Sequence, residues 1–230
     1  MILKGLQKTT LIDFPGHLAC TVFTYGCNFK CPFCHNPELV LAGNTDPDLK
    51  EEDFWHFLGS RQGLLEGVCI TGGEPTLHPD LPDFISKIKK LGFKVKLDTN
   101  GTNPEMLQAL MQDKLLDYIA MDVKNNLKDY AKTAGRHELN LEQIKASIAL
   151  ILDSGLDYEF RTTVVVGLHD ELNLQGIGEL IEGAGKFVIQ NFRPGKTLDP
   201  SLTDRQPFLD KQLQKFQKIM EKYVKKVELR

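Results

Sequence analysis

The sequence has 230 residues, of which 41% are hydrophobic and 26% charged, and its formal net charge is -3. This composition is that of a soluble globular protein, and the slightly acidic balance argues against a dedicated nucleic-acid-binding function. No apolar run is long enough to span a bilayer and the first residues contain no signal-peptide-like apolar region, so we expect a cytoplasmic protein with no membrane or nucleic-acid partner. No repeat, low-complexity tract or long linker divides the chain, so we expect a single domain, residues 1–230.

The first predicted strand, His17 to Tyr25, leads directly into a cysteine-rich segment with the sequence GCNFKCPFCHN. In this segment Cys27, Cys31 and Cys34 have the spacing C-x3-C-x2-C. Glycine and proline interrupt regular helix there, so we interpret the segment as a loop that can place three thiolates around one bound group. Soft thiolate ligands this close together favour an iron–sulfur cluster or zinc. Three protein ligands, rather than four, leave one metal position open for chemistry.

Simpler interpretations of the cysteine loop remain open. A zinc site of the three cysteines plus His35 has suitable ligand types, but the adjacent Cys34 and His35 are awkward ligands for one tetrahedral ion. The loop could also be a chance group of structural cysteines. The other two cysteines, Cys20 and Cys69, lie within apolar strands and are expected in the core. An odd number of cysteines, three of them clustered, does not indicate a disulfide framework.

Helices and strands alternate along the rest of the chain. Each expected helix has one apolar face, and Asp48 is the expected cap of the first. The predicted helices cover Pro47 to Leu58, Leu81 to Leu91, Pro104 to Met111, Leu141 to Leu152, Leu172 to Ala184 and Gln206 to Val224. The predicted strands cover Gly67 to Thr71, Phe93 to Leu97, Asp117 to Val123, Tyr158 to Val166 and Lys186 to Phe192, and the closing KKVELR contains a last short strand.

Repeated β–α units of this length predict a parallel sheet with right-handed crossovers. About six units are fewer than the eight of a closed barrel, so we predict an α/β fold, an open partial (β/α)6 barrel with parallel strands. Polar and glycine-rich segments follow each of the first four strands. Because the carboxyl ends of parallel strands meet at one rim, and sites are built at that rim, we expect these segments to form a functional site.

The second predicted strand ends in Thr71-Gly72-Gly73-Glu74-Pro75. Paired glycines let a backbone approach a ligand closely, and a carboxylate beside them can accept hydrogen bonds from an ammonium group. The same residues could also form an ordinary strand-to-helix turn. The motif becomes informative because a cysteine loop follows the preceding strand.

Together these motifs resemble the radical S-adenosylmethionine superfamily. The resemblance rests on C-x3-C-x2-C after the first strand, on an aromatic residue, Phe33, before the last cysteine, and on GGEP after the second strand. Longer segments of the sequence are similar to glycyl-radical-enzyme activases, and most of all to activating proteins of anaerobic ribonucleoside-triphosphate reductase. These segments are TLIDFPG, FTYGCNFKCPFCHNPELV, LDTNG and MDVK. The similarity runs from Leu6 to about Gly167 and is weaker beyond.

The resemblance implies a [4Fe–4S] cluster held by Cys27, Cys31 and Cys34, with S-adenosylmethionine bound to the fourth iron. One electron from the cluster would release methionine and a 5′-deoxyadenosyl radical, which would take a hydrogen atom from a backbone glycine of a partner enzyme. The implied partners are a glycyl radical enzyme, first of all an anaerobic ribonucleotide reductase, and a flavodoxin or ferredoxin-type electron donor. Alternatives are a pyruvate formate-lyase-type activase, a radical S-adenosylmethionine enzyme acting on a small molecule, and, in a different class, a zinc-stabilised binding module.

The resemblance also implies roles for residues near the cluster loop. Gly72, Gly73 and Glu74 would hold the amino group of the methionine moiety. Phe33 and the backbone at His35 would lie near the adenine. These roles are expectations carried over at matching positions of the motifs.

Five polar residues at later strand ends would complete the site by the same resemblance. Asp98, Thr99, Asp122 and Lys124 would meet the carboxylate or ribose of S-adenosylmethionine, and Arg161 is a further candidate for the carboxylate. A monovalent cation at Asp98, Thr99 and Asp122 is also implied as an option. The simpler alternatives are ordinary turn chemistry for the strand ends and an internal salt bridge for Arg161.

Overall fold

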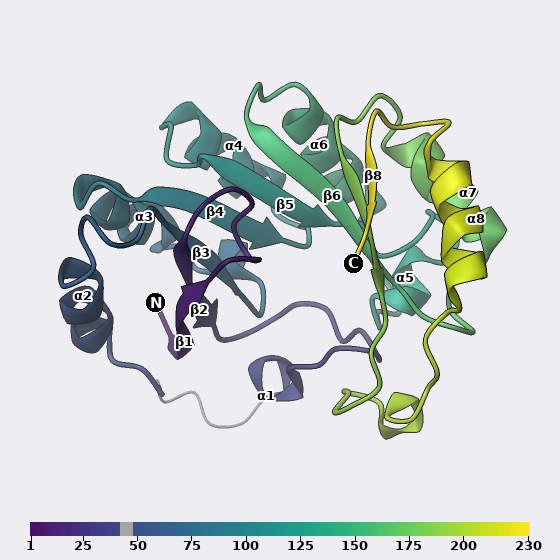
Figure 1. Cartoon of the computed structure of the whole chain (residues 1–230), viewed down its shortest axis with the longest axis horizontal. Coiled ribbons are helices and arrows are strands. Elements are labelled where there is room, and N and C mark those ends of the chain that lie inside the picture. Colours follow the sequence, from purple (N-terminus) through teal and green to yellow (C-terminus); the bar gives the residue numbers. More distant parts are fainter. Residues whose placement is uncertain (42–47) are drawn as a thin grey trace. The chain divides into compact units, whose positions relative to one another are not determined.

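The computed structural model describes residues 1–41 and 48–230, whose helices and strands are labelled in Figure 1. These residues divide into two compact units. The chain passes between the units several times. Strand β5 (Tyr118–Asp122) has its first residues in the first unit and its last in the second. The first unit comprises Met1–Asn28, Glu38–Thr99 and Asn103–Ile119, and the second comprises Phe29–Pro37, Asn100–Thr102 and Ala120–Arg230.

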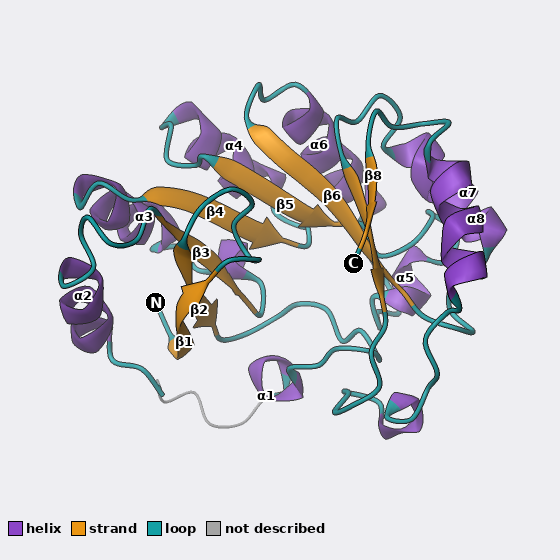
Figure 2. Ribbon diagram, viewed as in Figure 1, coloured by secondary structure: helices purple, strands orange, loops and turns teal. Residues whose placement is uncertain are grey.

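The first unit is built on strands β1 to β4, which follow one another in sequence order (Figure 2). β1 pairs antiparallel with β2, whereas β2, β3 and β4 are parallel. The register places Thr21 opposite Cys69 and Cys69 opposite Lys96, so these three side chains share one face of the sheet. The elements are β1 (Leu3–Thr10), β2 (Ala19–Thr24), α2 (Glu51–Gly59), β3 (Gly67–Gly72), a 3-10 helix (Pro75–Leu77), α3 (Leu81–Lys90), β4 (Lys94–Thr99) and α4 (Pro104–Gln112).

Local sequence explains these elements. α3 buries Phe84, Ile85 and Ile88 on one face and has a proline in its first turn, where a missing N–H costs nothing. α4 begins at Asn103, whose side chain accepts a hydrogen bond from the backbone N–H of Met106 at 3.2 Å. β2 and β3 are almost wholly buried, as expected of parallel strands covered on both faces.

The second unit contains the end of β5 and strands β6 to β8, which are parallel and again in sequence order. The chain just after β5 pairs with β6, because the N–H of Val123 donates to the carbonyl of Arg161 at 2.8 Å. α7 begins with a reciprocal pair of caps between Asp170 and Asn173, and it packs against α8. The elements are α5 (Tyr130–Thr133), α6 (Leu141–Leu152), β6 (Asp157–Val164), α7 (Glu171–Leu180), β7 (Phe187–Asn191), a 3-10 helix (Pro200–Leu202), α8 (Asp210–Met220) and β8 (Val227–Leu229). The short helix α1 (Pro37–Val40) has its first residue in the second unit and the others in the first.

Most expected elements are present, with some corrections. β1 was not predicted, because only its two end residues are buried and the polar residues between them hide the strand pattern. The short helices α1 and α5 were also missed, since four residues carry no periodic signal. Asp48 does not cap α2. The capping position is Lys50, without a side-chain cap, and Asp48 instead pairs with Lys4 at 3.6 Å. Pro47, the expected first residue of this helix, lies outside the described residues.

Other boundaries also differ. β4 extends through Asp98 and Thr99, so these two residues end the strand rather than follow it. α7 ends at Leu180 and α8 begins at Asp210, so both are shorter than predicted. The capping box of Asp170 and the glycine-containing turn after α7 set limits that apolar periodicity alone does not show.

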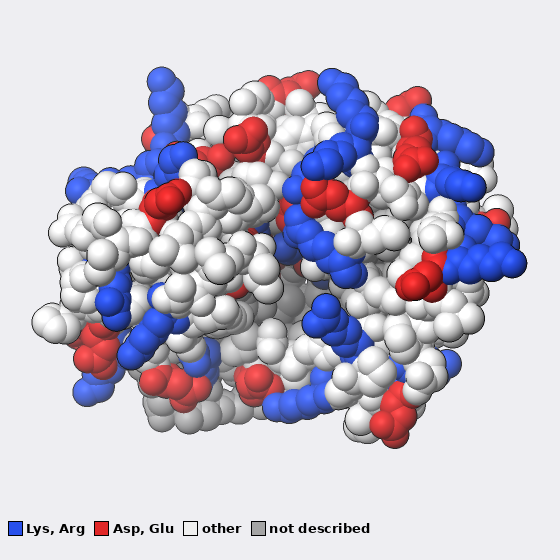
Figure 3. All heavy atoms as spheres, in the orientation of Figure 1, with Lys and Arg blue, Asp and Glu red and all other residues white. Residues whose placement is uncertain are grey.

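The predicted fold class is confirmed. The structure is α/β with mostly parallel strands, and no pairing among the described strands closes their order into a ring. None of the helices in residues 1–41 and 48–230 is long and apolar enough to cross a membrane. On the face seen in Figure 3, Lys and Arg side chains lie interspersed with Asp and Glu.

Glu159 on β6 is a buried carboxylate that binds Arg230, the residue directly after β8. Its side chain is 1% exposed and accepts two hydrogen bonds from Arg230, at 3.0 and 2.9 Å, and an ion pair from Lys186 at 3.1 Å. Burial works to raise the pKa of Glu159, but Arg230 and the other nearby cations outweigh it and lower the pKa. Glu159 is therefore ionised and stabilises the fold at neutral pH.

We predict that Arg230→Ala lowers the free energy of unfolding by about 1–3 kcal/mol at neutral pH, since the buried carboxylate of Glu159 loses both hydrogen bonds from Arg230 and keeps only the ion pair with Lys186. Because the folded pKa of Glu159 is depressed, its contribution is full above its ordinary value of 4.5 and is lost as the pH falls below it. The difference between wild type and Arg230→Ala should therefore shrink in acid, as measured by urea unfolding at several pH values. The exposed Lys222→Ala serves as control, and an equal loss at every pH would contradict the prediction.

Candidate active site

The cysteine loop directly follows β2, as predicted, and it leads into α1. None of its three cysteines forms a disulfide, and Cys27 and Cys34 are partly exposed whereas Cys31 is 7% exposed. Gly26, directly before Cys27, has φ +91°, a backbone conformation that glycine adopts readily. Within the second unit, the N–H of Cys34 donates to the carbonyl of Cys31 at 3.0 Å, so this part of the loop is a tight turn.

Residues of the second unit hold the cysteine loop from one side at Lys30. The N–H of Lys30 donates to the carbonyl of Ala134 at 2.9 Å. A Cβ at Gly135 would lie 1.9 Å from the Lys30 carbonyl oxygen, so only glycine fits this contact. Phe29 also packs edge-on against the buried ring of Tyr130, at 6.5 Å between ring centroids.

A segment after β7, residues 192–199, contacts the same loop at its other end. The N–H of Leu198 donates to the carbonyl of Cys34 at 2.9 Å, and His35 Nδ1 lies 3.0 Å from the carbonyl of Lys196. The ring of His35 stacks on Phe192 with 5.3 Å between centroids. This support was not predicted from the sequence, because contacts between distant backbone segments leave no pattern in the residue types.

Burial raises the pKa of the Cys31 thiol to about 11, although the nearby ammonium of Lys124 works in the opposite direction. A buried thiol of this kind is protonated until a positive charge stabilises its thiolate. A coordinating metal ion provides that charge and deprotonates the thiol outright. The environment of Cys31 therefore suits a metal ligand better than a solvent-exposed nucleophile.

The GGEP motif is placed in the first unit, at the end of β3, by very close backbone packing. Gly73 donates its N–H to the carbonyl of Thr24 at 2.9 Å, and Glu74 donates its N–H to the carbonyl of Gly26 at 2.7 Å. A Cβ at Gly73 would lie 1.9 Å from the Gly26 carbonyl oxygen, and one at Gly72, where φ is +117°, would lie 2.4 Å from Thr24 N. The paired glycines thus let two backbones meet, and they fix the GGEP turn against the chain that enters Cys27.

Glu74 is 1% exposed and joins the ends of β3 and β4. Its Oε1 accepts hydrogen bonds from Thr76 N at 3.1 Å, Thr76 Oγ1 at 2.6 Å and Thr99 Oγ1 at 2.7 Å. Glu74 also caps the 3-10 helix that follows it. The structure therefore brings together Glu74 and Thr99, two of the predicted site residues.

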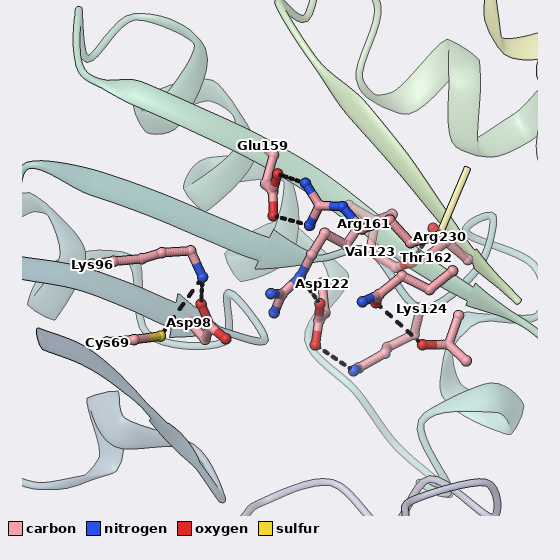
Figure 4. Close-up of polar contacts among 12 residues, drawn as sticks. Cys69, Lys96, Asp98, Asp122, Val123, Lys124, Glu159, Arg161, Thr162 and Arg230 are labelled. Atoms are coloured by element: carbon pink, nitrogen blue, oxygen red, sulfur yellow. Dashed lines mark hydrogen bonds and ion pairs between the residues drawn. The ribbon is translucent and has the colours of Figure 1, made fainter. Parts of the chain in front are cut away.

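Asp98, beside Thr99, contacts a lysine that was not singled out from the sequence. Lys96 is 1% exposed, and its ammonium pairs with Asp98 Oδ1 and lies 3.8 Å from Cys69 Sγ (Figure 4). The alternation in β4 of Val95 and Leu97 with Lys96 and Asp98 is a signal that could have found the pair, because residues two apart on a strand share a face.

In the second unit Asp122, Lys124 and Arg161 form one charged group (Figure 4). Arg161 Nε donates to Asp122 Oδ1 at 2.8 Å and Lys124 Nζ donates to Asp122 Oδ2 at 3.1 Å. Burial works to raise the pKa of Asp122, but the charges of Arg161 and Lys124 outweigh it and hold the pKa well below its usual range. The internal salt bridge considered as the simpler role of Arg161 is thus present.

The donor chemistry fits an iron–sulfur cluster. The loop offers three cysteines that form no disulfide, and the segment from Phe29 to Pro37 is held in place from both ends within its unit. Phe33, next to Cys34, is 6% exposed. Among residues 1–41 and 48–230, no three His, Cys, Asp or Glu side chains gather around a position for a single metal ion.

Comparisons with known proteins agree on one family. The Radical SAM superfamily model matches residues 21–182. A protein of Methanocaldococcus jannaschii, provisionally named a glycyl-radical enzyme activating enzyme, is 33% identical over 236 residues, covering 100% of this chain and 95% of that protein. The pyruvate formate-lyase-activating enzyme of Listeria monocytogenes is 32% identical over 137 residues, 52% of each chain.

A solved structure shows the same fold. The structure of SuiB from Streptococcus suis bound to S-adenosylmethionine matches with a TM-score of 0.65 and 14% identity, covering 91% of this chain and 51% of that chain. At this identity the likeness concerns the fold alone. The match to the family model includes the cysteine loop and GGEP and extends over most of the chain, so the chain belongs to the radical SAM superfamily.

Proposed function

We propose that this chain is an activating enzyme that generates a radical on a glycine of a glycyl radical enzyme, and that the partner is an anaerobic ribonucleotide reductase. One observation carries the proposed activity: the similarity to the Methanocaldococcus jannaschii protein named for it extends over the whole chain. The choice of reductase as partner is supported by the resemblance of the sequence motifs alone. The similarity to the Listeria monocytogenes enzyme supports the same reaction type and makes a pyruvate formate-lyase the second candidate partner. Both partners present the same chemical target, a C–H bond of a backbone glycine.

Membership of the superfamily gives the chain its two cofactors, a [4Fe–4S] cluster and S-adenosylmethionine. When bound, they supply a 5′-deoxyadenosyl radical by one-electron cleavage of the sulfonium. The role of the chain is to hold the cluster through Cys27, Cys31 and Cys34, to orient S-adenosylmethionine and to exclude other hydrogen donors. In this proposal the electron comes from a flavodoxin or ferredoxin-type donor in the cytoplasm.

The proposed amino-group site lies in the first unit at Gly72, Gly73 and Glu74. Glu74 is supported in this role by its burial and by its hydrogen bonds from Thr76 and Thr99, which give its carboxylate one fixed position. A fixed carboxylate attracts an ammonium group without a further loss of side-chain entropy. Glu74 is thus proposed to orient the amino group of S-adenosylmethionine.

The proposed carboxylate site uses the charged group of the second unit. Asp122 contributes one negative charge, and Arg161 and Lys124 contribute two positive charges, so the group keeps a net positive charge. A partly buried group of net positive charge suits a carboxylate ligand. Phe33 and the backbone at His35 are proposed to lie near the adenine, and the fixed ring of His35 supports this by limiting motion of the loop.

We also propose that residues 1–230 act as one catalytic domain. Strand β5 supports this, because it is a single strand that contributes Tyr118 and Ile119 to the first unit and its last three residues to the second. The family match supports it too, because the Radical SAM superfamily model covers residues 21–182, which include residues of both units.

The direct test of the proposed function is electron paramagnetic resonance of a partner enzyme. Reduced, reconstituted protein mixed with S-adenosylmethionine and an anaerobic ribonucleotide reductase should produce a glycine-centred doublet. A partner with its radical-bearing glycine changed to alanine, and the Cys31→Ser variant of this chain, should give no doublet. A doublet only with a pyruvate formate-lyase would move the proposal to the second partner, and turnover of a small molecule with no doublet in either would reject it.

We predict that Gly73→Ala weakens S-adenosylmethionine binding by about tenfold and lowers the free energy of unfolding by about 1–3 kcal/mol, the usual range for overpacking. The added Cβ would clash with the Gly26 carbonyl and separate the GGEP turn from the chain entering Cys27. Equilibrium dialysis and thermal unfolding of the reconstituted protein measure the two effects. Gly59→Ala is the matched control, because a Cβ there meets nothing within 4 Å, and equal binding by both variants would contradict the prediction.

We predict that Arg161→Met weakens S-adenosylmethionine binding by about tenfold, because the group around Asp122 loses its net positive charge. Methionine keeps much of the side-chain volume without the charge. Exposed Arg205→Met is the control and should bind as wild type does. Unchanged binding by Arg161→Met, with a loss of stability only, would show that Arg161 has just the structural salt-bridge role.

A further inference from the structure

Lys96 is unusual among the lysines of this chain because its side chain is 1% exposed. Lysine is almost never fully buried unless its charge is paired, since burying an unpaired ammonium is very costly. Lys94, two residues earlier, is the first residue of β4; it is exposed, and its Nζ lies 3.2 Å from His17 Nε2. The burial of Lys96 therefore reflects its particular place in β4 rather than the strand as a whole.

The surroundings of Lys96 within the first unit direct its charge toward the carboxyl end of the strand. Cys69 is its register partner on β3, with Sγ 3.8 Å from the ammonium, and the ring of Tyr118 lies 5.9 Å away. Neither is a strong counter-charge for an ammonium. Asp98 provides that counter-charge, from the position two residues along on the same face (Figure 4).

Asp98 is one of the residues that the resemblance implies as ligands of a monovalent cation. Its neighbour Thr99 is fixed by Glu74, so the Lys96–Asp98 pair lies at the rim assigned above to S-adenosylmethionine. A carboxylate that already pairs with a buried ammonium has little remaining attraction for a second cation. In the second unit Asp122 is likewise compensated, by Arg161 and Lys124. These carboxylates therefore do not fit a site for a free monovalent cation.

We propose that Lys96 is a built-in counter-charge of Asp98 that replaces the monovalent cation, so that S-adenosylmethionine binding by this chain is independent of K⁺ and Na⁺. Lys96 is a positioning residue: it holds the Asp98 carboxylate in place rather than reacting itself. The inference rests on the S-adenosylmethionine site proposed above, but not on the identity of the partner enzyme. It is therefore tested without any partner.

The experiment measures S-adenosylmethionine binding to the reconstituted holoprotein by equilibrium dialysis in choline chloride, KCl, NaCl and NH₄Cl at equal ionic strength. Wild type should bind equally in all four salts, within about twofold. Lys96→Met should bind about tenfold more weakly in choline chloride and recover several-fold in KCl or NH₄Cl, where a free cation can take the vacated place beside Asp98. Lys94→Met, with the same change on an exposed lysine of β4, should behave as wild type.

Two results would overturn the proposal: wild-type binding that requires K⁺ or Na⁺, or a loss in Lys96→Met that no cation restores although the variant is folded. Lys96→Arg gives a second measurement if the methionine variant does not fold, because it keeps the charge. Binding by Lys96→Arg should stay independent of the salt, and a dependence on K⁺ would contradict the proposal. Failure to activate a partner enzyme would leave these binding results unchanged, so the two proposals fail separately.

Discussion

The contact between the backbones of Gly73 and Gly26 is the constraint on which the site in the first unit depends. The Gly26 carbonyl accepts the N–H of Glu74 at 2.7 Å, and there is no room between the strands for a Cβ at Gly73. Cys27 follows Gly26 directly, so the position of the first cysteine is tied to the end of β3. Because close-packed backbones do not deform continuously, the GGEP turn and the entry to the cysteine loop behave as one rigid piece.

Charge compensation is the second organising principle. Each unit presents acidic residues at strand ends, and each supplies its own cations: Lys96 for Asp98 in the first, Arg161 and Lys124 for Asp122 in the second. A buried carboxylate without a partner would take up a proton instead of staying ionised. Paired in this way, the carboxylates are held in position before any ligand arrives, which reduces the ordering that a ligand must bring about.

The sequence alone predicts the features that have a periodic or spacing signal. The alternation of strands and helices predicts the α/β class, and among the residues expected at the strand ends Glu74 contacts Thr99 and Asp122 contacts Lys124. Features that depend on backbone contacts between distant segments were not predictable, such as the support of His35 by the Lys196 carbonyl. Lys96 was overlooked because a lysine in a strand is usually solvated, and its burial is a tertiary property. The close approach of Gly72 and Gly73 to a neighbouring backbone was not predicted either, because it too is a tertiary property.

The central claim is that the cysteine loop holds a cluster which cleaves S-adenosylmethionine, and it can be tested without a partner enzyme. The protein is reconstituted anaerobically with iron and sulfide, reduced, and incubated with S-adenosylmethionine, and 5′-deoxyadenosine is then quantified. The account predicts a brown protein with about four irons per chain, as a [4Fe–4S] cluster requires, and 5′-deoxyadenosine formed only after reduction. A colourless protein that retains zinc, takes up no iron and forms no 5′-deoxyadenosine would contradict it.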